Sequence, residues 1–257
     1  MIRIKAEEEI ATMQEGGRRH AEILQTLASM VEPGISTLTL EEEALRLIRE
    51  GGDKPAHLGY TPKGVSRPFP AALCVSINNE IVHGIPNEVP KVLKQGDIVS
   101  LDLSIIHKGM FTDSAITVPV GAVDDESREL LRVTEAALYA GIDAAKPGNH
   151  IGDIGAAISA VVKISKFTLA KDLVGHGVGY GLHEEPYVPN TGRKGTGEKL
   201  LAGMVIAIEP MVNVGKGDIK VLPDGYTIVT KDGSRSAHFE HTIAIIEKGN
   251  IILTSND

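Results

Sequence analysis

The feature that most constrains the fold is the segment 96–117, which reads GDIVSLDLSIIHKGMFTDSAIT. Apolar and polar side chains alternate along its first half, as they do on a β-strand that buries one face. The apolar positions are Val99, Leu101, Leu103 and Ile105, and the polar positions are Ser100, Asp102 and Ser104. A turn sequence at 107–109 follows, and a second alternating run carries Asp113. The pattern predicts a β-hairpin with one apolar and one polar face.

This hairpin brings Asp102 and Asp113 together on its polar face. For a turn centred between His107 and Lys108, the two aspartates lie opposite each other, and a bulge at Gly109 would shift them by one position. Opposed side chains lie roughly 5 Å apart at Cβ. Two carboxylates at that separation repel each other unless a proton or a cation lies between them. A shared proton and a bound metal ion both fit the hairpin taken alone.

Composition and charge set limits on the class of protein. The chain has 257 residues, of which 42% are hydrophobic, enough for one large domain or two small ones with an apolar core. A net charge of -8 argues against binding nucleic acid through bulk charge. The single cysteine, Cys74, excludes an intramolecular disulfide and suits a reducing compartment. We expect neither a signal peptide nor a membrane span, and therefore a cytoplasmic protein.

The rest of the sequence predicts further helices and strands. The expected helices cover 6–29, 39–50, 124–146 and 151–165, and the expected strands cover 72–82, 204–208, 226–230 and 236–246. Thr39 and Glu42 are predicted to form a capping box at the start of the second helix. Asp232-Gly233 predicts a hairpin turn between the last two strands, and this pairing would place Tyr226 beside Glu240. Residues 53–72 are interpreted as a long loop of the kind that often carries function.

The order of these features repeats along the chain. The first half contains Pro33-Gly34, His83 to Pro86, Asp102 and Asp113, and the second half contains Pro147-Gly148, His183 to Pro186, Glu209 and Glu240. We therefore predict an α+β fold in which residues 1–123 and 124–257 form two similar halves related by a pseudo-two-fold axis. The acids of both halves would meet at the seam between them.

Five residues form a candidate set of metal ligands: Asp102, Asp113, His176, Glu209 and Glu240. Four carboxylates and one imidazole are too many donors for one divalent ion, but they suit two ions about 3.5–4 Å apart. A set of oxygen and nitrogen donors without thiolate favours Mn, Fe, Co or Zn over Ca or Mg, because imidazole prefers the former ions. The glycines on both sides of His176 would allow the backbone to approach a ligand closely.

The motifs that carry these residues resemble those of the type I methionine aminopeptidases. They are SLDLS, TDSA, GHGVGYGLHEEP, AIEPM and FEHT, together with VSINNEIVHGIP around His83. The resemblance spans nearly the whole chain, and all five ligand positions are filled in order. It implies the pita-bread fold, an α+β fold with antiparallel sheet inside and helices outside, as a single catalytic domain over 1–257.

The resemblance also implies a role for each ligand. Asp102 and Asp113 would chelate one ion, His176 and Glu209 would hold the other, and Asp113 and Glu240 would bridge the two. A hydroxide between the ions would attack the carbonyl of the first peptide bond. Glu209 would pass a proton to the leaving amine.

Two histidines are expected to act on the substrate directly. His183 would hydrogen-bond to the carbonyl oxygen as it becomes an oxyanion, and His83 would contact the scissile amide. The substrate would be the N-terminal peptide of nascent proteins, cleaved after methionine when the second residue is small. We further expect a monomer, a contact with the ribosome on the strength of the resemblance, no direct specificity for nucleic acid, and no membrane association.

The pocket for the methionine side chain is expected to be lined by His57, Tyr60, Phe69, Cys74, Leu182 and Tyr226, together with His83 and His183. Three of these positions depart from the family. A cysteine is common where His57 stands, a phenylalanine where Leu182 stands, and a tryptophan where Tyr226 stands. The loop that follows Tyr60 also looks longer. Cys74 would fit equally well as a small buried apolar residue.

Four alternatives compete with this interpretation. A Xaa-Pro dipeptidase or aminopeptidase shares the fold, but those enzymes usually carry an extra N-terminal domain. A non-catalytic pita-bread binding module typically lacks some of the ligands that are all present here. A type II methionine aminopeptidase would need a large helical insertion where this chain has only a short loop at 186–203. A calcium-binding protein would not be expected to use His176.

Overall fold

The computed structural model describes residues 2–62 and 64–256. Within these ranges the helices are α1 (Glu7–Ser29), α2 (Thr37–Glu50), α3 (Asp125–Ala144) and α4 (Ile151–Lys163). The longer strands are β2 (Leu73–Ile77), β4 (Ile98–His107), β5 (Met110–Pro119), β7 (Val174–Gly177), β8 (Glu184–Pro189), β9 (Val205–Ile208), β14 (Glu240–Ile246) and β15 (Gly249–Ile252). The shorter strands are β1 (Lys54–Pro55), β3 (Glu80–Val82), β6 (Thr168–Leu169), β10 (Met211–Asn213), β11 (Ile219–Val221), β12 (Ile228–Thr230) and β13 (Ser236–His238). None of these helices combines the length and the apolar character that crossing a bilayer requires.

The largest sheet joins nine strands. Its order is β1-β4-β5-β14-β9-β7-β8, with β2 also paired to β4 and β15 also paired to β14. The pairs that form it are antiparallel, which with the flanking helices confirms the predicted α+β class. Strands β2, β4 and β5 and strands β7, β9 and β14 follow each other in mirrored order about the β5–β14 pair. Two equivalent halves would give this order, and the equivalence of 1–123 and 124–257 stays a prediction.

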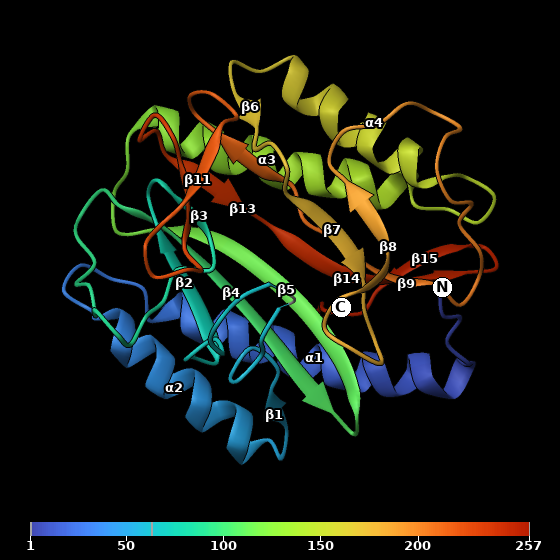
Figure 1. Cartoon of the computed structure of the whole chain (residues 1–257), viewed down its shortest axis with the longest axis horizontal. Coiled ribbons are helices and arrows are strands. Elements are labelled where there is room, and N and C mark those ends of the chain that lie inside the picture. Colours follow the sequence, from blue (N-terminus) through green and yellow to red (C-terminus); the bar gives the residue numbers. More distant parts are fainter. Residues whose placement is uncertain (1, 63, 257) are drawn as a thin grey trace.

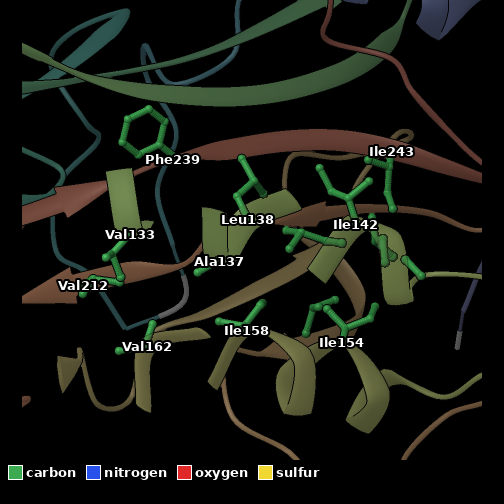
Figure 2. Close-up of a cluster of buried hydrophobic side chains, with 14 of the residues drawn as sticks. Val133, Ala137, Leu138, Ile142, Ile154, Ile158, Val162, Val212, Phe239 and Ile243 are labelled. Atoms are coloured by element: carbon green, nitrogen blue, oxygen red, sulfur yellow. The ribbon is translucent and has the colours of Figure 1, made fainter. Parts of the chain in front are cut away.

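The helices cover the sheet in two pairs (Figure 1). α1 and α2 lie beside the strands of the first half, where α1 packs on β4 and β5, and α3 and α4 pack together over the second half. Leu101 and Leu103 of β4 join the core beneath α1 and α2, as the alternation predicts. In the other core, Leu138 of α3, Ile158 of α4 and Ile243 of β14 lie together (Figure 2). The polar positions of β4 therefore point to the opposite side of the sheet, away from the helices.

The turn of the aspartate hairpin lies one position later than predicted. Residues 108–109 form the turn with φ values of 47° and 88°, as a two-residue type I′ turn requires. Asp102 is therefore opposite Ala115, and Asp113 is opposite Ser104. The two aspartates are thus neighbours on the sheet rather than direct partners. Both still share one face, because the register differs from the prediction by an even number of residues.

Two predicted element boundaries are also wrong. α2 begins at Thr37, because the hydroxyl of Ser36, 3.2 Å from the backbone nitrogen of Leu38, caps the helix before Thr39 is reached. The predicted strand 72–82 is two strands, β2 and β3, separated by a turn in which Asn78 has φ of 55°. β3 then leaves the large sheet and pairs with β12.

The hairpin predicted at Asp232-Gly233 does not form between the flanking strands. β12 pairs with β11 and β3, whereas β13 pairs with β10. Long-range pairing thus overrides the local turn signal, as is common for strands. The pairing that was predicted to place Tyr226 beside Glu240 is accordingly wrong.

A glycine pair lets α1 lie close to the sheet. Glycine disfavours a helix interior, yet Gly16 and Gly17 are buried within α1. A Cβ on Gly16 would lie 2.6 Å from Cβ of His107, and a Cβ on Gly17 would lie 2.1 Å from the carbonyl oxygen of Leu253. The absence of side chains at these two positions therefore sets the distance between α1 and the strands.

We expect Gly17→Ala to destabilise the protein, although alanine favours a helix by about 1 kcal/mol. The new methyl group would overlap the carbonyl of Leu253, and overpacking of this kind costs about 1–3 kcal/mol. Because the clash is with backbone, we expect the upper end of this cost and a net loss of about 2 kcal/mol. Arg18→Ala, at the exposed next position of α1, should change the free energy of unfolding by less than about 0.5 kcal/mol. Urea denaturation measures both. A Gly17→Ala protein as stable as the wild type would contradict this close approach.

Candidate metal centre

The five candidate ligands line one cavity of about 510 Å³. Asp102 lies on β4, Asp113 on β5, His176 on β7, Glu209 directly after β9, and Glu240 at the start of β14. Four of them are buried, and the side chain of Glu209 is 12% exposed. The fold thus brings together the residues that the sequence singled out from both halves of the chain.

Strand register explains why two of the acids meet. Asp102 and Glu240 are both paired with Ala115, so the three residues form one row across β4, β5 and β14. Paired residues in an antiparallel sheet point to the same face. The small side chain of Ala115 leaves space between the two carboxylates.

A second row brings Asp113 toward His176. His176 is paired with Ala207, which is paired in turn with Thr242. The hydroxyl of Thr242 accepts a hydrogen bond from the backbone nitrogen of Asp113 at 2.9 Å and donates to its carbonyl oxygen at 2.7 Å. An alanine and a threonine thus separate the acid and the imidazole, as Ala115 does in the first row.

His176 presents Nε2 to the acids. Its Nδ1 lies 3.0 Å from the carbonyl oxygen of Gly177, so Nδ1–H donates there and Nε2 carries the lone pair. Nε2 lies 3.4 Å from Oε1 of Glu209 and 3.7 Å from Oδ2 of Asp113. Burial lowers the pKa of His176 to about 3, so the ring is neutral, as a metal ligand must be.

The glycines beside His176 have a different purpose from the one predicted. A Cβ on Gly175 would lie 2.4 Å from the carbonyl oxygen of Ala207, and a Cβ on Gly177 would lie 2.2 Å from that of Glu185. Both glycines therefore admit neighbouring backbone rather than a ligand. They hold β7 tightly between β9 and β8.

Burial and mutual repulsion keep protons on the acids. Burial raises the pKa of Asp102, Glu209 and Glu240 well above the usual values, and the charge of Asp113 adds to each shift. Burial raises the pKa of Asp113 itself to about 7. Among the described residues, no lysine or arginine lines the cavity. The acids therefore have no positive side chain to neutralise them.

Divalent cations fit this donor set. Oδ1 of Asp102 and Oε1 of Glu240 are buried without a hydrogen-bond partner within the described part of the chain. Donor atoms of Asp113, His176 and Glu240 all lie within 4.8 Å of one another. Carboxylate and neutral imidazole are donors that Mn, Fe, Co and Zn accept. Bound cations would replace the protons and relieve the repulsion.

A chain of hydrogen bonds holds Asp113 from behind. The hydroxyl of Ser104 donates to Oδ1 of Asp113 at 2.6 Å, so it accepts from Nε2 of His57 at 2.8 Å. Nδ1 of His57 then faces the thiol of Cys74 at 3.8 Å. Burial lowers the pKa of His57 to about 3, which keeps this ring neutral. His57, supported by Cys74, therefore helps to orient the candidate ligand Asp113 through Ser104.

Two further histidines stand on the cavity wall. His83 has φ of 59°, and the next residue must be glycine, since a Cβ on Gly84 would lie 2.2 Å from backbone. The ring of His183 packs edge-on against His176 with centroids 4.4 Å apart, and its Nδ1 lies 2.7 Å from the hydroxyl of Tyr60. Burial lowers the pKa of both His83 and His183 to about 4. Each is thus a neutral hydrogen-bonding group.

The predicted pocket residues divide into two groups. His57 and Tyr60 line the cavity, whereas Phe69, Cys74, Leu182 and Tyr226 are buried outside its lining. Phe69 and Tyr226 still support the wall, since Phe69 packs edge-on against both His57 and Tyr226. Tyr226 reaches this place by donating a hydrogen bond to the carbonyl of Arg67, at 2.5 Å, rather than by pairing with β14.

The sequence interpretation missed several residues of the site. Val82, Leu173, Val174, Tyr187 and Met211 line the cavity, as do Glu184 and Glu185. Glu184 is half-buried and bound to Lys5 at 2.8 Å. His238 is fully buried next to two of the acids. Its position two residues before Glu240 was the available signal, because alternate residues of a strand share a face.

The fold and the site together define a metallopeptidase. Residues 11–247 match the model of Metallopeptidase family M24, and the chain belongs to this family. It is 45% identical to "Methionine aminopeptidase 1" of Bacillus subtilis over 254 residues, 99% of both chains. It is also 45% identical to "Methionine aminopeptidase" of Aquifex aeolicus over 256 residues, 98% of both chains.

Solved structures agree with these relatives. The crystal structure of a methionine aminopeptidase from Thermotoga maritima has a TM-score of 0.94 at 44% identity, with 99% of this chain and 100% of that chain covered. The predicted pita-bread fold and the resemblance to methionine aminopeptidases are confirmed. A prolidase from Pyrococcus furiosus has a TM-score of 0.73 at 21% identity and is covered over 66% of its length, a likeness that concerns the fold alone.

We expect metal binding to release protons and to weaken as the pH falls below about 7. Asp113, with a pKa of about 7, must lose its proton to bind a cation, whereas His176, with a pKa of about 3, does not compete at these pH values. Calorimetric titration of Mn²⁺ into metal-free protein, between about pH 6 and pH 8 in buffers of different ionisation enthalpy, counts the released protons. An affinity independent of pH would show that the acids are already ionised.

Proposed function

We infer that the chain is a metal-dependent exopeptidase that removes N-terminal methionine from peptides and nascent proteins. The observation that carries this proposal is the convergence of four carboxylates, three of them buried, and a neutral imidazole in one cavity. Full-length similarity at 41–45% identity to proteins named methionine aminopeptidase supports the choice of substrate. The alternative of a non-catalytic module has no support among the cavity residues, because every expected ligand position is filled.

We propose that the five ligands hold two divalent ions. Asp102 and Asp113 would hold one ion, His176 and Glu209 would hold the other, and Asp113 and Glu240 would contribute to both. Bound ions of this kind would lower the pKa of water to near neutrality and polarise the substrate carbonyl. Mn, Fe, Co and Zn all suit these donors.

The residues around the ligands would complete the reaction. Glu209 is the most accessible of the acids and would carry a proton from the attacking water to the leaving amine. When the Tyr60 hydroxyl donates to Nδ1 of His183, the ring keeps a proton on Nε2 and can donate to an oxyanion. His83 would hydrogen-bond to the scissile amide from the cavity wall.

The cavity also limits the substrate. Neutral histidines and Tyr60 on one wall, with Val82 and Met211 on another, give a small pocket of mixed character for an unbranched, polarizable side chain. A volume of about 510 Å³ is at the lower end of ligand pockets, so a small second residue should be preferred. Similarity to Xaa-Pro dipeptidases lies at 20–22% identity and concerns the fold alone.

The proposal has consequences beyond the site. An enzyme that acts on nascent chains would work in the cytoplasm, where such chains emerge. We propose that it acts as a monomer, since the described chain supplies all five ligands itself. A contact with the ribosome rests on the resemblance to the family alone.

We expect a Met-Ala-Ser peptide to lose its methionine in the presence of Co²⁺ or Mn²⁺, and a chelator to stop the reaction. In a panel of peptides that varies the second residue, Ala, Gly and Ser should be accepted, and Leu, Arg and Glu should be refused. Free methionine, measured by chromatography, reports the rate. Full activity after exhaustive chelation would exclude the metal mechanism, and cleavage only before proline would favour the Xaa-Pro alternative.

A pair of variants separates metal binding from carbonyl activation. Asp113→Asn should lose both metal and nearly all turnover, because a shared carboxylate is replaced by a weaker donor. His183→Ala should keep its metal content and lose about 10²–10³ in kcat, the usual effect of removing one oxyanion donor. Metal analysis and steady-state kinetics measure both quantities. Retention of full metal content by Asp113→Asn would count against a shared role.

A further inference from the structure

His238 lies deep in the molecule with neither ring nitrogen bonded. The residue is 1% exposed, and both Nδ1 and Nε2 are buried without a hydrogen-bond partner in the described part of the chain. An unsatisfied buried polar group costs about 1–3 kcal/mol, so a buried ring with two of them needs an explanation. It does not line the cavity but stands behind Glu209 and Glu240.

The ring of His238 is directed at two acids of the metal centre. Its Nε2 lies 3.6 Å from Oε2 of Glu209 and 3.9 Å from Oε2 of Glu240. His176 is placed in the same way on the other side of Glu209, with Nε2 3.4 Å from Oε1. The carboxylate of Glu209 therefore has an imidazole nitrogen facing each of its two oxygens.

These distances are too long for hydrogen bonds but suit donors that share an ion. An N–H···O bond spans about 2.7–3.2 Å. Nitrogen and oxygen ligands at about 2.1 Å from one ion lie about 3.0–3.6 Å apart for angles of about 90–120°. The separation of 3.6 Å to Glu209 is at the upper end of this range, whereas the 3.9 Å to Glu240 lies beyond it, as does the 3.7 Å from Nε2 of His176 to Asp113. The spacing that identifies His176 as a candidate ligand thus applies to His238 as well.

Strand geometry fixes this placement. His238 ends β13 and Glu240 begins β14, so the two residues are two positions apart along the chain. His238 is also paired with Met211 of β10, which lines the cavity just after Glu209. The histidine is therefore held by the same two segments that carry both glutamates.

We propose that His238 is a second imidazole ligand of the metal centre, bound to an ion that it shares with Glu209 and Glu240. The proposal rests on the metal-dependent function inferred above and extends its ligand set from five residues to six. A second neutral nitrogen donor would strengthen the preference for Mn, Fe, Co or Zn over Mg and Ca. It would also give Nε2 of the buried ring the partner that it lacks among the described protein atoms.

Proton NMR of the Co²⁺-loaded protein tests the proposal directly. Each histidine bound to Co²⁺ gives one strongly shifted, exchangeable ring N–H resonance, so the wild type should show two. His238→Gln should retain the resonance of His176 and lose the other, and His176→Gln should show the converse. His241→Gln is the matched control, because this nearby half-buried histidine bonds to Thr254 instead.

Metal affinity gives a second readout. A Mn²⁺ titration should show binding at least about 10-fold weaker in His238→Gln than in wild type, and unchanged in His241→Gln. A single shifted resonance in the wild type, with tight Co²⁺ binding, would overturn the proposal and leave the metal-dependent function intact. Absence of Co²⁺ binding by the wild type would instead refute the function itself. The count of resonances in the wild type needs no variant to fold.

Discussion

The gathering of four carboxylates, three of them buried, at the seam of one sheet is the constraint on which the rest of the structure depends. Acids in such a place are stable only as neutral groups or next to cations. The described cavity wall contains no cationic side chain. The negative charge of these carboxylates must therefore be balanced from solution. Protons balance it when no metal is bound, and metal ions balance it when they are.

Burial acts in opposite directions on the two kinds of donor, and this determines how metal binding couples to pH. It raises the pKa of the carboxyl groups, so they hold protons that a cation must displace. It lowers the pKa of His57, His176 and His238 to about 3, so these rings are neutral at working pH. Among these side chains, proton release on metal binding would therefore come from the acids, while the neutral ring of His176 offers the lone pair of Nε2.

Local patterns were sufficient to predict much of this architecture. The alternation in β4 identified which face Asp102 occupies, and the motifs placed both halves of the ligand set in order. The patterns failed where pairing between distant segments decides the structure. β12 pairs with β3 and β11 rather than with β13, so Tyr226, just before β12, does not lie opposite Glu240. His238 was missed for a related reason, since only the packed structure shows that its ring has no other partner.

Metal chemistry and substrate choice are separable in this fold. The candidate ligands lie on or next to paired strands, where register fixes each side chain and where small residues such as Ala115 and Ala207 hold the spacing. The part of the cavity wall that we propose contacts the substrate comes instead from the loop that carries His57 and Tyr60. The segment around Tyr226 supports this loop through side-chain contacts with Phe69 and Tyr60. Loops vary more easily than paired strands. A prolidase shares the fold at 21% identity, and a fold alone does not determine which peptide is bound. We therefore expect the choice of peptide to depend on the side chains of the cavity wall.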